Sequence, residues 1–543
     1  MSISHIGNRA KSLETTPRIL AEAALEIPKK SALFYQDAKP LPMASHGEGI
    51  YIFDESGKRY IDACSGAIST NLGHGNKRMQ EAVQRQMSKI SFTYRTQFDS
   101  RPANELADLL ARCGPDELNR VFFVNSGSEA VESCIKLARQ YWWSVGKSSK
   151  SLIISRSPSY HGATLGALSC TDYAPLNIPF RPMQLPFPKV SAPYCYHCPL
   201  EKTYPECEVA CGRELEKAIR LYGADNIAGF IAEPFGGAST GATVPPDEYF
   251  PMVERICHEN NILLIIDDVM TGCGRTGTFY GFEHWNIVPD IVALSKGLSG
   301  GYTPIGACMA SEAIVQPVLD SGGFMHGHTY AGNPLSASIA LECVKIILED
   351  NLVENSRKMG TILHERLHDL KGKFPIIGDV RGRGLFAGIE FVRDRAKREP
   401  FPAKWIVGQV ATRIAREEYG LIIYPRRSIW GLSGDHVLIA PPLITTEAQI
   451  HEIIELFEKT LNHLMRHIHA DVDPVSAHLP DGTVQRFKQE ENLPDYALGN
   501  ITQISPVPDA NTTQVMNNDP YPPYGEDEEE ETTEVIYQDK PHD

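Results

Sequence analysis

The 543-residue sequence has no apolar run long enough to cross a membrane. Its longest apolar stretches, such as residues 262–266, fall far short of the roughly 20 residues that a spanning helix needs. Three basic residues near the start, Arg9, Lys11 and Arg18, are not followed by the apolar segment of a signal peptide. We therefore expect a soluble, cytoplasmic protein without a membrane partner, with a mitochondrial location as the alternative.

Positive charge is also scarce. The chain has 52 Lys and Arg residues against 68 Asp and Glu residues, a formal net charge of -16. Because a nucleic-acid binder needs clustered Lys and Arg, this balance argues against a nucleic-acid partner. Twelve cysteines in so long a chain favour reduced thiols over the disulfide framework of small secreted domains. The absence of a repeat of fixed period argues against a solenoid or propeller.

The sequence instead alternates short apolar runs with segments of helical period. Short apolar runs suit strands that are buried on both faces, and they occupy residues 121–124, 151–155, 229–232, 262–266 and 291–294. Helical patterns over 129–143 and 247–260 lie between them. This order predicts an α/β fold with a large, doubly wound, mostly parallel sheet.

Composition changes along the chain predict its division into domains. We expect the large α/β domain over residues 87–333 and a smaller α+β domain over 334–470. The N-terminal segment 1–86 is expected to pack with the smaller domain. From about residue 471 to 543 the sequence is rich in Pro, Asp, Asn and Gln and ends in an acidic run. Such a composition predicts a disordered acidic tail, because it cannot bury enough apolar surface to offset its ordering entropy.

An acid and an amine follow two of the predicted strands. Asp267 ends one apolar run and Lys296 follows another, 29 positions later (296 − 267). In open α/β sheets the ligand crevice lies at the carboxyl ends of the strands, so both side chains are expected to face one pocket. A lysine there can form an imine with an aldehyde cofactor, and a carboxylate can keep a pyridine nitrogen protonated. A structural ion pair at the sheet edge is the alternative interpretation.

A turn of small residues leads from the first strand into a helix. Ser126 and Glu129 have the spacing of a capping box. The free amides at such a helix start bind phosphate, and Gly127 permits its close approach. An ordinary helix cap is the alternative.

Together with further motifs, these residues resemble the class III, or omega-amino-acid, aminotransferases, which depend on pyridoxal phosphate. The resemblance covers roughly residues 45 to 465. It rests on seven blocks in family order: NSGSEAVE (125–132), SYHG (159–162), EP (233–234), DDVMTGCGRTG (267–277), SKG (295–297), HTYAGNP (328–334) and VRGRG (380–384). It implies pyridoxal-phosphate transferase fold type I, with pyridoxal 5'-phosphate held in the large domain.

The resemblance also implies a role for each motif residue. Lys296 would be the Schiff-base lysine and proton shuttle, with Asp267 on the pyridine nitrogen. The remaining cofactor contacts would come from Tyr160 and Val269 on the two ring faces, Gly127 and Ser128 on the phosphate, and Thr329 on the phosphate of the neighbouring subunit. The last contact implies a homodimer with two shared active sites. His161 is expected to be packed or hydrogen-bonded rather than the catalytic base.

Other positions bear on the substrate. Arg381 matches the family position that grips a substrate carboxylate, and Tyr94 falls where relatives place a pocket aromatic. Ornithine and GABA aminotransferases carry a masking Glu where this chain has Ala238, and Met270 and Asp268 also depart from that branch. The resemblance therefore implies a broader amine or omega-amino-acid transaminase that uses a keto acid, pyruvate or 2-oxoglutarate, as acceptor in a ping-pong cycle.

Two other functions remain open at this point. A pyridoxal-phosphate decarboxylase, epimerase or phospholyase would share the same cofactor residues, because these reactions diverge after one bond breaks. A non-enzymatic binding module is the second alternative, although the intact cofactor motifs argue against it.

Two groups of residues could be read as metal ligands. The pair His326 and His328 lacks the further ligands that a metal site needs, so we expect no metal there. Four cysteines have metal-like spacing, and they leave reduced thiols, a disulfide or a bound metal open: Cys195, Cys198, Cys207 and Cys211.

Overall fold

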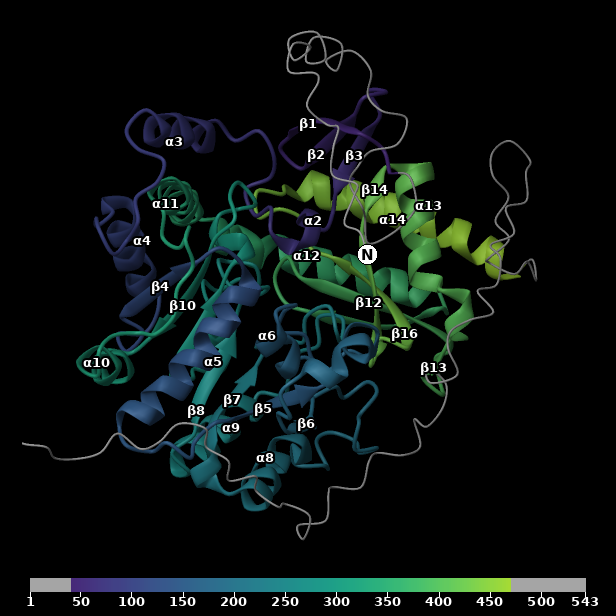
Figure 1. Ribbon diagram of the computed structural model, residues 1–543. Coiled ribbons are helices and arrows are strands. Elements are labelled where there is room, and N and C mark those ends of the chain that lie inside the picture. Colours follow the sequence, from purple (N-terminus) through teal and green to yellow (C-terminus); the bar gives the residue numbers. More distant parts are fainter. Residues whose placement is uncertain (1–40, 470–543) are drawn as a thin grey trace, which may run out of the picture. The chain divides into compact units, whose positions relative to one another are not determined.

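The computed structural model describes residues 41–469 (Figure 1). The predicted tail over 471–543 lies outside the described residues, as does the first part of the N-terminal segment. None of the described helices is both long enough and apolar enough to span a membrane.

A seven-stranded sheet forms the centre of the large α/β part. Its order is β4 (Arg120–Val124), β10 (Gly306–Ala310), β9 (Ile291–Leu294), β8 (Leu263–Asp267), β7 (Ile227–Ala232), β5 (Leu152–Ser157) and β6 (Lys189–Ser191). Only β10 is antiparallel to its neighbours; the pairs from β9 to β6 are parallel. The five predicted apolar runs are all strands of this sheet, and the predicted fold class is confirmed. The sequence analysis missed β6 and β10.

Helices cover both faces of this sheet because its strands are apolar on both sides. On one face lies α5 (Gly127–Ser144), whose Ala130 and Val131 share a core with Ile231 and Ile265 of the strands. Alternate strand residues such as Leu264 face a second core. The helices of that core include α8 (Ala210–Tyr222), α9 (Tyr249–Glu259), α11 (Pro334–Glu349), α3 (Lys77–Met87) and α4 (Arg101–Arg112). The helix α10 (Glu312–Asp320) packs beside α5 in the first core. Figure 1 shows α5 lying across the strands.

Two smaller sheets complete the described fold. The first contains β1 (Ala44–Glu48), β2 (Tyr51–Asp54), β3 (Arg59–Asp62) and β14 (Leu421–Ile422). Its strand β3 pairs with β14, so an early and a late segment of the chain share one sheet. The second contains β11 (Ile377–Gly382), β12 (Ala387–Asp394), β16 (Ser433–Ile439) and β15 (Tyr424–Ile429), with β13 (Glu399–Pro400) paired to β12.

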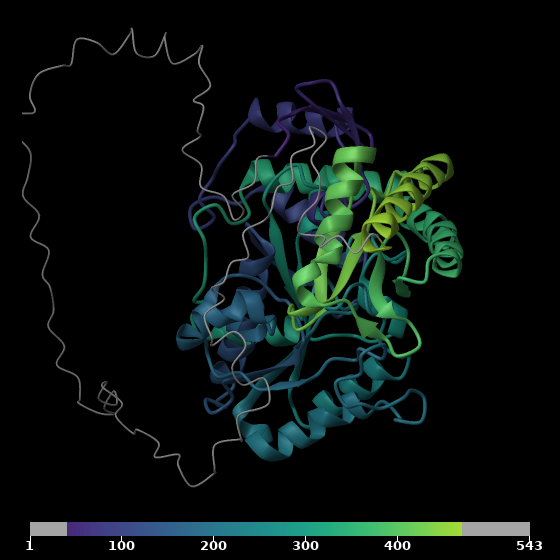
Figure 2. The same ribbon diagram turned by 90° about the vertical axis from the view of Figure 1, so that its right-hand side faces the viewer.

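Three long helices pack with these smaller sheets: α12 (Leu352–Lys373), α13 (Val407–Tyr419) and α14 (Glu447–His469). Figure 2 shows α13 beside α14. The domain boundaries at residues 86, 333 and 470 stay a prediction.

Short elements connect the sheets. They are α2 (Ser65–Ile68), α6 (Leu165–Cys170), α7 (Ala174–Asn177) and the 3-10 turns η1 (Ile178–Met183), η2 (Ala224–Asn226), η3 (Gly281–Trp285), η4 (Lys296–Leu298) and η5 (Ala403–Trp405). Five of them contribute residues to the candidate site: α2, α6, α7, η1 and η4.

Candidate active site

A cavity of about 410 Å³ opens at the carboxyl ends of the central strands. Asp267, the last residue of β8, and Lys296, two residues beyond β9, both line it. Ser126 to Ser128 reach it from the end of β4, and Tyr160 reaches it from beyond β5. The parallel strands thus bring residues from four separate motifs together at one sheet edge, as the sequence analysis expected.

Asp267 is buried and held by two hydrogen bonds. Its Oδ1 accepts the backbone N–H of Val269 at 3.2 Å, and its Oδ2 lies 2.8 Å from Nδ1 of the buried His161. His161 therefore fixes the orientation of the carboxylate, a role that its position in the SYHG motif did not reveal. The expectation that His161 is hydrogen-bonded is met by this contact.

Lys296 is placed as a reactive amine. Burial lowers its pKa from the usual value, although Asp267 and Glu233 oppose the change. Its backbone φ of +47° lies in the left-handed region, which is uncommon for a residue other than glycine. Strained backbone of this kind is typical of functional sites.

The start of α5 forms a cradle of backbone amides. Ser126 caps the helix by accepting the N–H of Glu129 at 3.2 Å, which leaves the amides of Gly127 and Ser128 at the cavity. A Cβ atom on Gly127 would lie 2.9 Å from Cγ1 of Val269, closer than real Cβ contacts allow. Only glycine therefore keeps this part of the cradle open.

The chemistry of this set of groups fits pyridoxal phosphate. The Lys296 amine can react with an aldehyde, and the Asp267 carboxylate can pair with a protonated ring nitrogen. The amides of Gly127 and Ser128 can hold a phosphate at the positive end of the α5 dipole. Tyr160 and Val269 line the same cavity. The individual roles of these residues stay predictions.

The outer part of the cavity has mostly apolar walls. Four residues from α6, the following segment and η1 line it: Leu168, Tyr173, Leu176 and Phe180. From β15 come Tyr424 and Arg426, and Arg426 is the only arginine among the lining residues. The sequence analysis missed both β15 residues. Residues two apart lie on the same face of a strand, so these two could have been expected to point the same way if the sequence had shown that β15 is a strand.

Arg381 does not line the cavity in the structure. Its guanidinium donates to Glu390 Oε2 at 2.7 Å, to Asp379 Oδ2 at 3.1 Å and to the Thr240 carbonyl at 2.6 Å. Burial alone would raise the pKa of Glu390, but Arg381 and His197 outweigh it and lower that pKa to about 2. Two carboxylates therefore already pair with the guanidinium, and the contact of Arg381 with a substrate carboxylate stays a prediction.

Tyr94 and Thr329 also lie away from the cavity lining. Both are exposed, and they belong to segments that touch each other: the rings of Phe92 and Tyr330 lie 5.4 Å apart, and Arg95 donates to the His326 carbonyl at 2.9 Å. The contact of Thr329 with a neighbouring subunit, and the role of Tyr94 beside the substrate, remain untested.

The two histidines that could be read as metal ligands each lie near another side chain. His326 Nε2 lies 3.0 Å from Ser133 Oγ, and His328 Nδ1 lies 3.8 Å from Glu129 Oε1. Over residues 41–469, no group of three or more His, Cys, Asp or Glu side chains is arranged to hold a metal ion.

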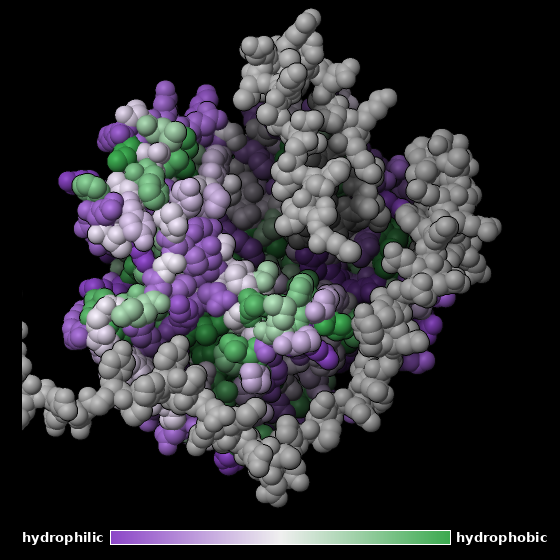
Figure 3. All heavy atoms as spheres, in the orientation of Figure 1, coloured by the Kyte–Doolittle hydropathy of each residue, from purple (hydrophilic) through white to green (hydrophobic). Residues whose placement is uncertain are grey.

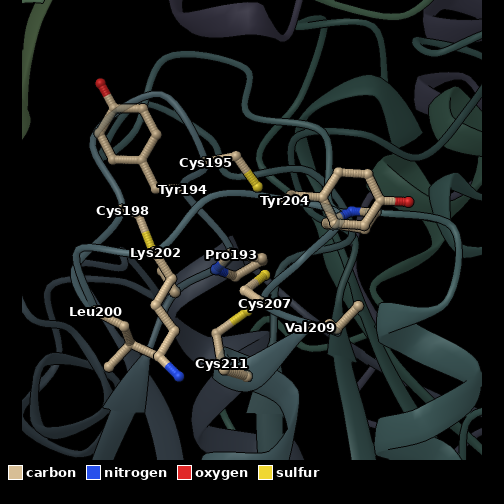
Figure 4. A pocket seen from close by; sticks show the side chains of 13 residues that line it. Pro193, Tyr194, Cys195, Cys198, Leu200, Lys202, Tyr204, Cys207, Val209 and Cys211 are labelled. Atoms are coloured by element: carbon tan, nitrogen blue, oxygen red, sulfur yellow. The ribbon is translucent and has the colours of Figure 1, made fainter.

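The four closely spaced cysteines surround a small hollow of about 10 Å³ (Figure 4). Cys198 lies apart from Cys207 and Cys211 in this view. All twelve cysteines belong to the described part of the chain, and none of them forms a disulfide there.

Comparisons with known proteins agree with the geometry. The class-III aminotransferase family model matches residues 35–461. The uncharacterized aminotransferase YodT of Bacillus subtilis is 40% identical over 432 residues, which cover 79% of this chain and 97% of YodT. The putrescine–pyruvate aminotransferase of Pseudomonas aeruginosa is 35% identical and covers 76% of this chain and 89% of its own length.

Solved structures show the same similarity. An amine transaminase from an uncultivated Pseudomonas species, in its pyridoxal-phosphate-bound form, superposes with a TM-score of 0.75 at 30% identity, covering 81% of this chain and 99% of that one. That structure contains the cofactor that the cavity residues fit. The chain belongs to the class III aminotransferase family and is an enzyme that transfers amino groups.

Proposed function

We propose that this aminotransferase binds pyridoxal phosphate at Lys296 and moves an amino group from an amine or omega-amino acid to pyruvate or 2-oxoglutarate in a ping-pong cycle. The observation that supports it most is the placement of Lys296 and Asp267 in one cavity with the amide cradle of α5. The same-fold decarboxylase, epimerase and phospholyase readings are not favoured by the transaminase relatives.

Bound pyridoxal phosphate would supply the aldehyde that takes up the amino group and a ring that accepts electrons. The chain's own residues would do the rest. Burial lowers the pKa of the Lys296 amine, and this favours its role in taking a proton from the substrate carbon and returning it. Asp267, held by His161 and the Val269 amide, would be the partner of the ring nitrogen. The apolar walls limit the entry of water.

The substrate end of the cavity favours apolar amines and one carboxylate. Leu176 and Phe180 provide apolar surface for the body of the amine, and Arg426 provides the guanidinium that pairs with the carboxylate of a keto acid or omega-amino acid. We assign this contact to Arg426 in place of Arg381, which is neutralised by Glu390 and Asp379. The putrescine–pyruvate relative supports an amine donor and pyruvate as acceptor.

We further propose that the enzyme is a cytoplasmic homodimer. The segments around Tyr94 and Thr329 carry exposed apolar side chains, among them Phe98, Met325 and Tyr330, each more than 60% exposed. In Figure 3 hydrophobic residues also reach the surface near α3. A second copy that covers these segments would bring the partner subunit's Thr329 toward the phosphate cradle, as the family resemblance implies.

The first test is an absorbance spectrum of the purified enzyme during addition of a panel of amines without any keto acid. Conversion of the visible cofactor band into the pyridoxamine phosphate band identifies the donor and demonstrates the first half-reaction. An unchanged band, or release of carbon dioxide or phosphate, would favour a decarboxylase or lyase.

Lys296→Ala provides the matching test of the residue. We expect turnover to fall by about a thousandfold or more, because the amine both anchors the cofactor and transfers the proton. Lys404→Ala, at an exposed lysine of η5, is the control and should leave turnover unchanged. Near-normal turnover of Lys296→Ala would refute the assignment.

A further inference from the structure

The outer cavity is enclosed by two walls from distant parts of the chain. We call residues 168–180 the roof segment; Leu168, Tyr173, Leu176 and Phe180 contribute its cavity side. A second wall belongs to the β15–β16 hairpin, residues 424–439, through Tyr424 and Arg426. Because both walls line one cavity, a shift of either wall would change the space left for the amine.

The second half of the roof segment is weakly packed. Its α7 is four residues long and leads into η1, and Leu176 and Phe180 are exposed to 41% and 46%, whereas Leu168, Cys170 and Tyr173 are buried. Segments with few buried apolar contacts open locally at low free-energy cost. Contacts from outside the segment therefore contribute much of what holds it in place.

Trp430, in the turn of the hairpin, provides such contacts. Its indole Nε1 donates to Ser157 Oγ at 2.8 Å, and this hydroxyl donates in turn to Asp172 Oδ2 at 2.5 Å. The Trp430 carbonyl accepts the backbone N–H of Ala174 at 3.0 Å. Since Ser157 is the last residue of β5, these bonds connect the hairpin, the roof segment and the large sheet.

Close packing accompanies these hydrogen bonds. A Cβ atom on Gly431, whose φ is +77°, would lie 2.6 Å from Pro175 Cδ and 2.7 Å from Tyr173 Cε1. The backbone N–H of Arg427 also donates to the Tyr173 hydroxyl at 3.3 Å. The hairpin and the roof segment thus meet with no room for another side chain between them.

We propose that Trp430 is a positioning residue that holds the β15–β16 hairpin against the roof segment and thereby sets the width of the substrate cavity. The proposal rests on the proposed function, because the cavity must be the amine site for its width to affect selectivity. Trp430 itself does not line the cavity. It acts through Tyr173 and Arg426, which do.

The test compares Trp430→Phe, Ser157→Ala and the double variant. Each single variant removes the same indole–hydroxyl bond, and Trp430→Phe keeps an aromatic ring in the turn. We expect the ratio of kcat/KM for 1-phenylethylamine to that for propylamine to rise about fivefold through KM, as loss of one hydrogen bond loosens the roof. The double variant should change the ratio no further than Ser157→Ala alone, because Ser157→Ala already removes the indole–hydroxyl bond together with the bond to Asp172. Trp405→Phe, in η5 outside the cavity, is the matched control and should leave the ratio unchanged.

Hydrogen exchange over residues 172–177 gives a readout that does not need turnover. The same single variants should increase exchange in this peptide, whose Ala174 amide bonds to Trp430. Unchanged exchange, or an unchanged amine ratio in variants that turn over, would overturn the proposal, as would additive effects in the double variant. Failure of the proposed function would look different: the wild-type cofactor band would not respond to amines, while the exchange measurement would still decide the role of Trp430.

Discussion

At the scale of single residues, Glu390 is one of two carboxylates that pair with the buried Arg381, the other being Asp379. It is fully buried and accepts hydrogen bonds from Arg381, Ser428 and the Tyr194 hydroxyl. Replacing its charge weakens these charge-assisted hydrogen bonds and leaves Asp379 as the remaining carboxylate beside Arg381. We therefore expect Glu390→Gln to lower the free energy of unfolding at neutral pH by about 2 kcal/mol, measured by urea denaturation.

The pH dependence of this loss follows from the pKa of Glu390. Arg381 and His197 outweigh burial and lower that pKa to about 2, from an ordinary 4.5. A carboxyl with a depressed pKa stabilises the folded state above its unfolded pKa, and this contribution disappears as the pH falls. The stability difference between wild type and Glu390→Gln should thus shrink between pH 4.5 and 2. Glu399→Gln, in an exposed pair with Arg393, should change stability by less than about 1 kcal/mol and serves as control.

Replacing Arg426 should change the choice of substrate. Its guanidinium lies 4.2 Å from the centre of the Tyr424 ring and is the carboxylate partner that we propose. Arg426→Ala should raise KM for pyruvate about tenfold or more, because a charge-assisted bond is lost. The first half-reaction with an amine that has no carboxylate should change by less than about twofold, since no bond to Arg426 is involved. Equal losses for both substrates would show that Arg426 supports the cavity in general.

At the scale of elements, the sequence predicts the buried strands well and the hairpin poorly. The strands β4, β5, β7, β8 and β9 are continuous apolar runs, because both of their faces are covered. By contrast, β15 reads YPRRSI, since one of its faces carries Tyr424 and Arg426 at the cavity and Ser428 in the Glu390 network. Residues that contact substrate weaken the very periodicity by which a strand is recognised.

The same difference separates the cofactor residues from the substrate residues. Lys296, Asp267 and Gly127 follow predicted strands directly, so their common location could be expected from the order of strands and turns alone. Arg426 reaches the cavity only through the pairing of β15 with β16, a contact that no local pattern records. For Arg381 the motif itself could be recognised in the sequence. Its pairing with Glu390 could not, because Arg381 lies on β11 and Glu390 on β12.

The prediction at the scale of elements concerns the cradle of backbone amides at the start of α5, which we expect to hold the phosphate. Gly127→Ala would bring a Cβ atom within 2.9 Å of Val269 Cγ1, so the turn or Val269 must shift. We expect the apoprotein to bind pyridoxal phosphate about tenfold more weakly, as measured by absorbance titration, because the amides lose their alignment. Gly372→Ala in α12, where an added Cβ would meet no atom within 4 Å, should leave affinity unchanged. A restored affinity in Gly127→Ala with Val269→Ala would identify the clash as the cause.

At the scale of the whole molecule, the exposed segments around Tyr94 and Thr329 concern assembly. They touch one another through Phe92 and Tyr330, yet keep Phe98 and Met325 exposed to 68% and 66%. Large apolar side chains gathered on two adjoining segments are typical of a protein interface. The sequence alone suggested the dimer only through family resemblance, because single-chain periodicity carries no information about a surface between copies.

If two chains share each active site, mixing two impaired variants should restore activity, which a monomeric enzyme could not do. If the partner's Thr329 binds the phosphate, Lys296→Ala and Thr329→Ala homodimers should both be impaired, the first by loss of the amine and the second by about tenfold weaker cofactor binding.

A heterodimer of the Lys296→Ala and Thr329→Ala chains contains one site with both residues intact and one site with neither. Mixing and refolding equal amounts should therefore restore up to about a quarter of wild-type activity at limiting cofactor, since half of the dimers are mixed and each has one good site of two. Replacing Thr329→Ala by Thr361→Ala, at an exposed position of α12, gives the control, because the Thr361→Ala homodimer keeps both Lys296 and Thr329 and mixing should give only the mean of the separate homodimers. Activity of the Lys296→Ala and Thr329→Ala mixture equal to the mean of the separate homodimers would show that each site is built from one chain alone.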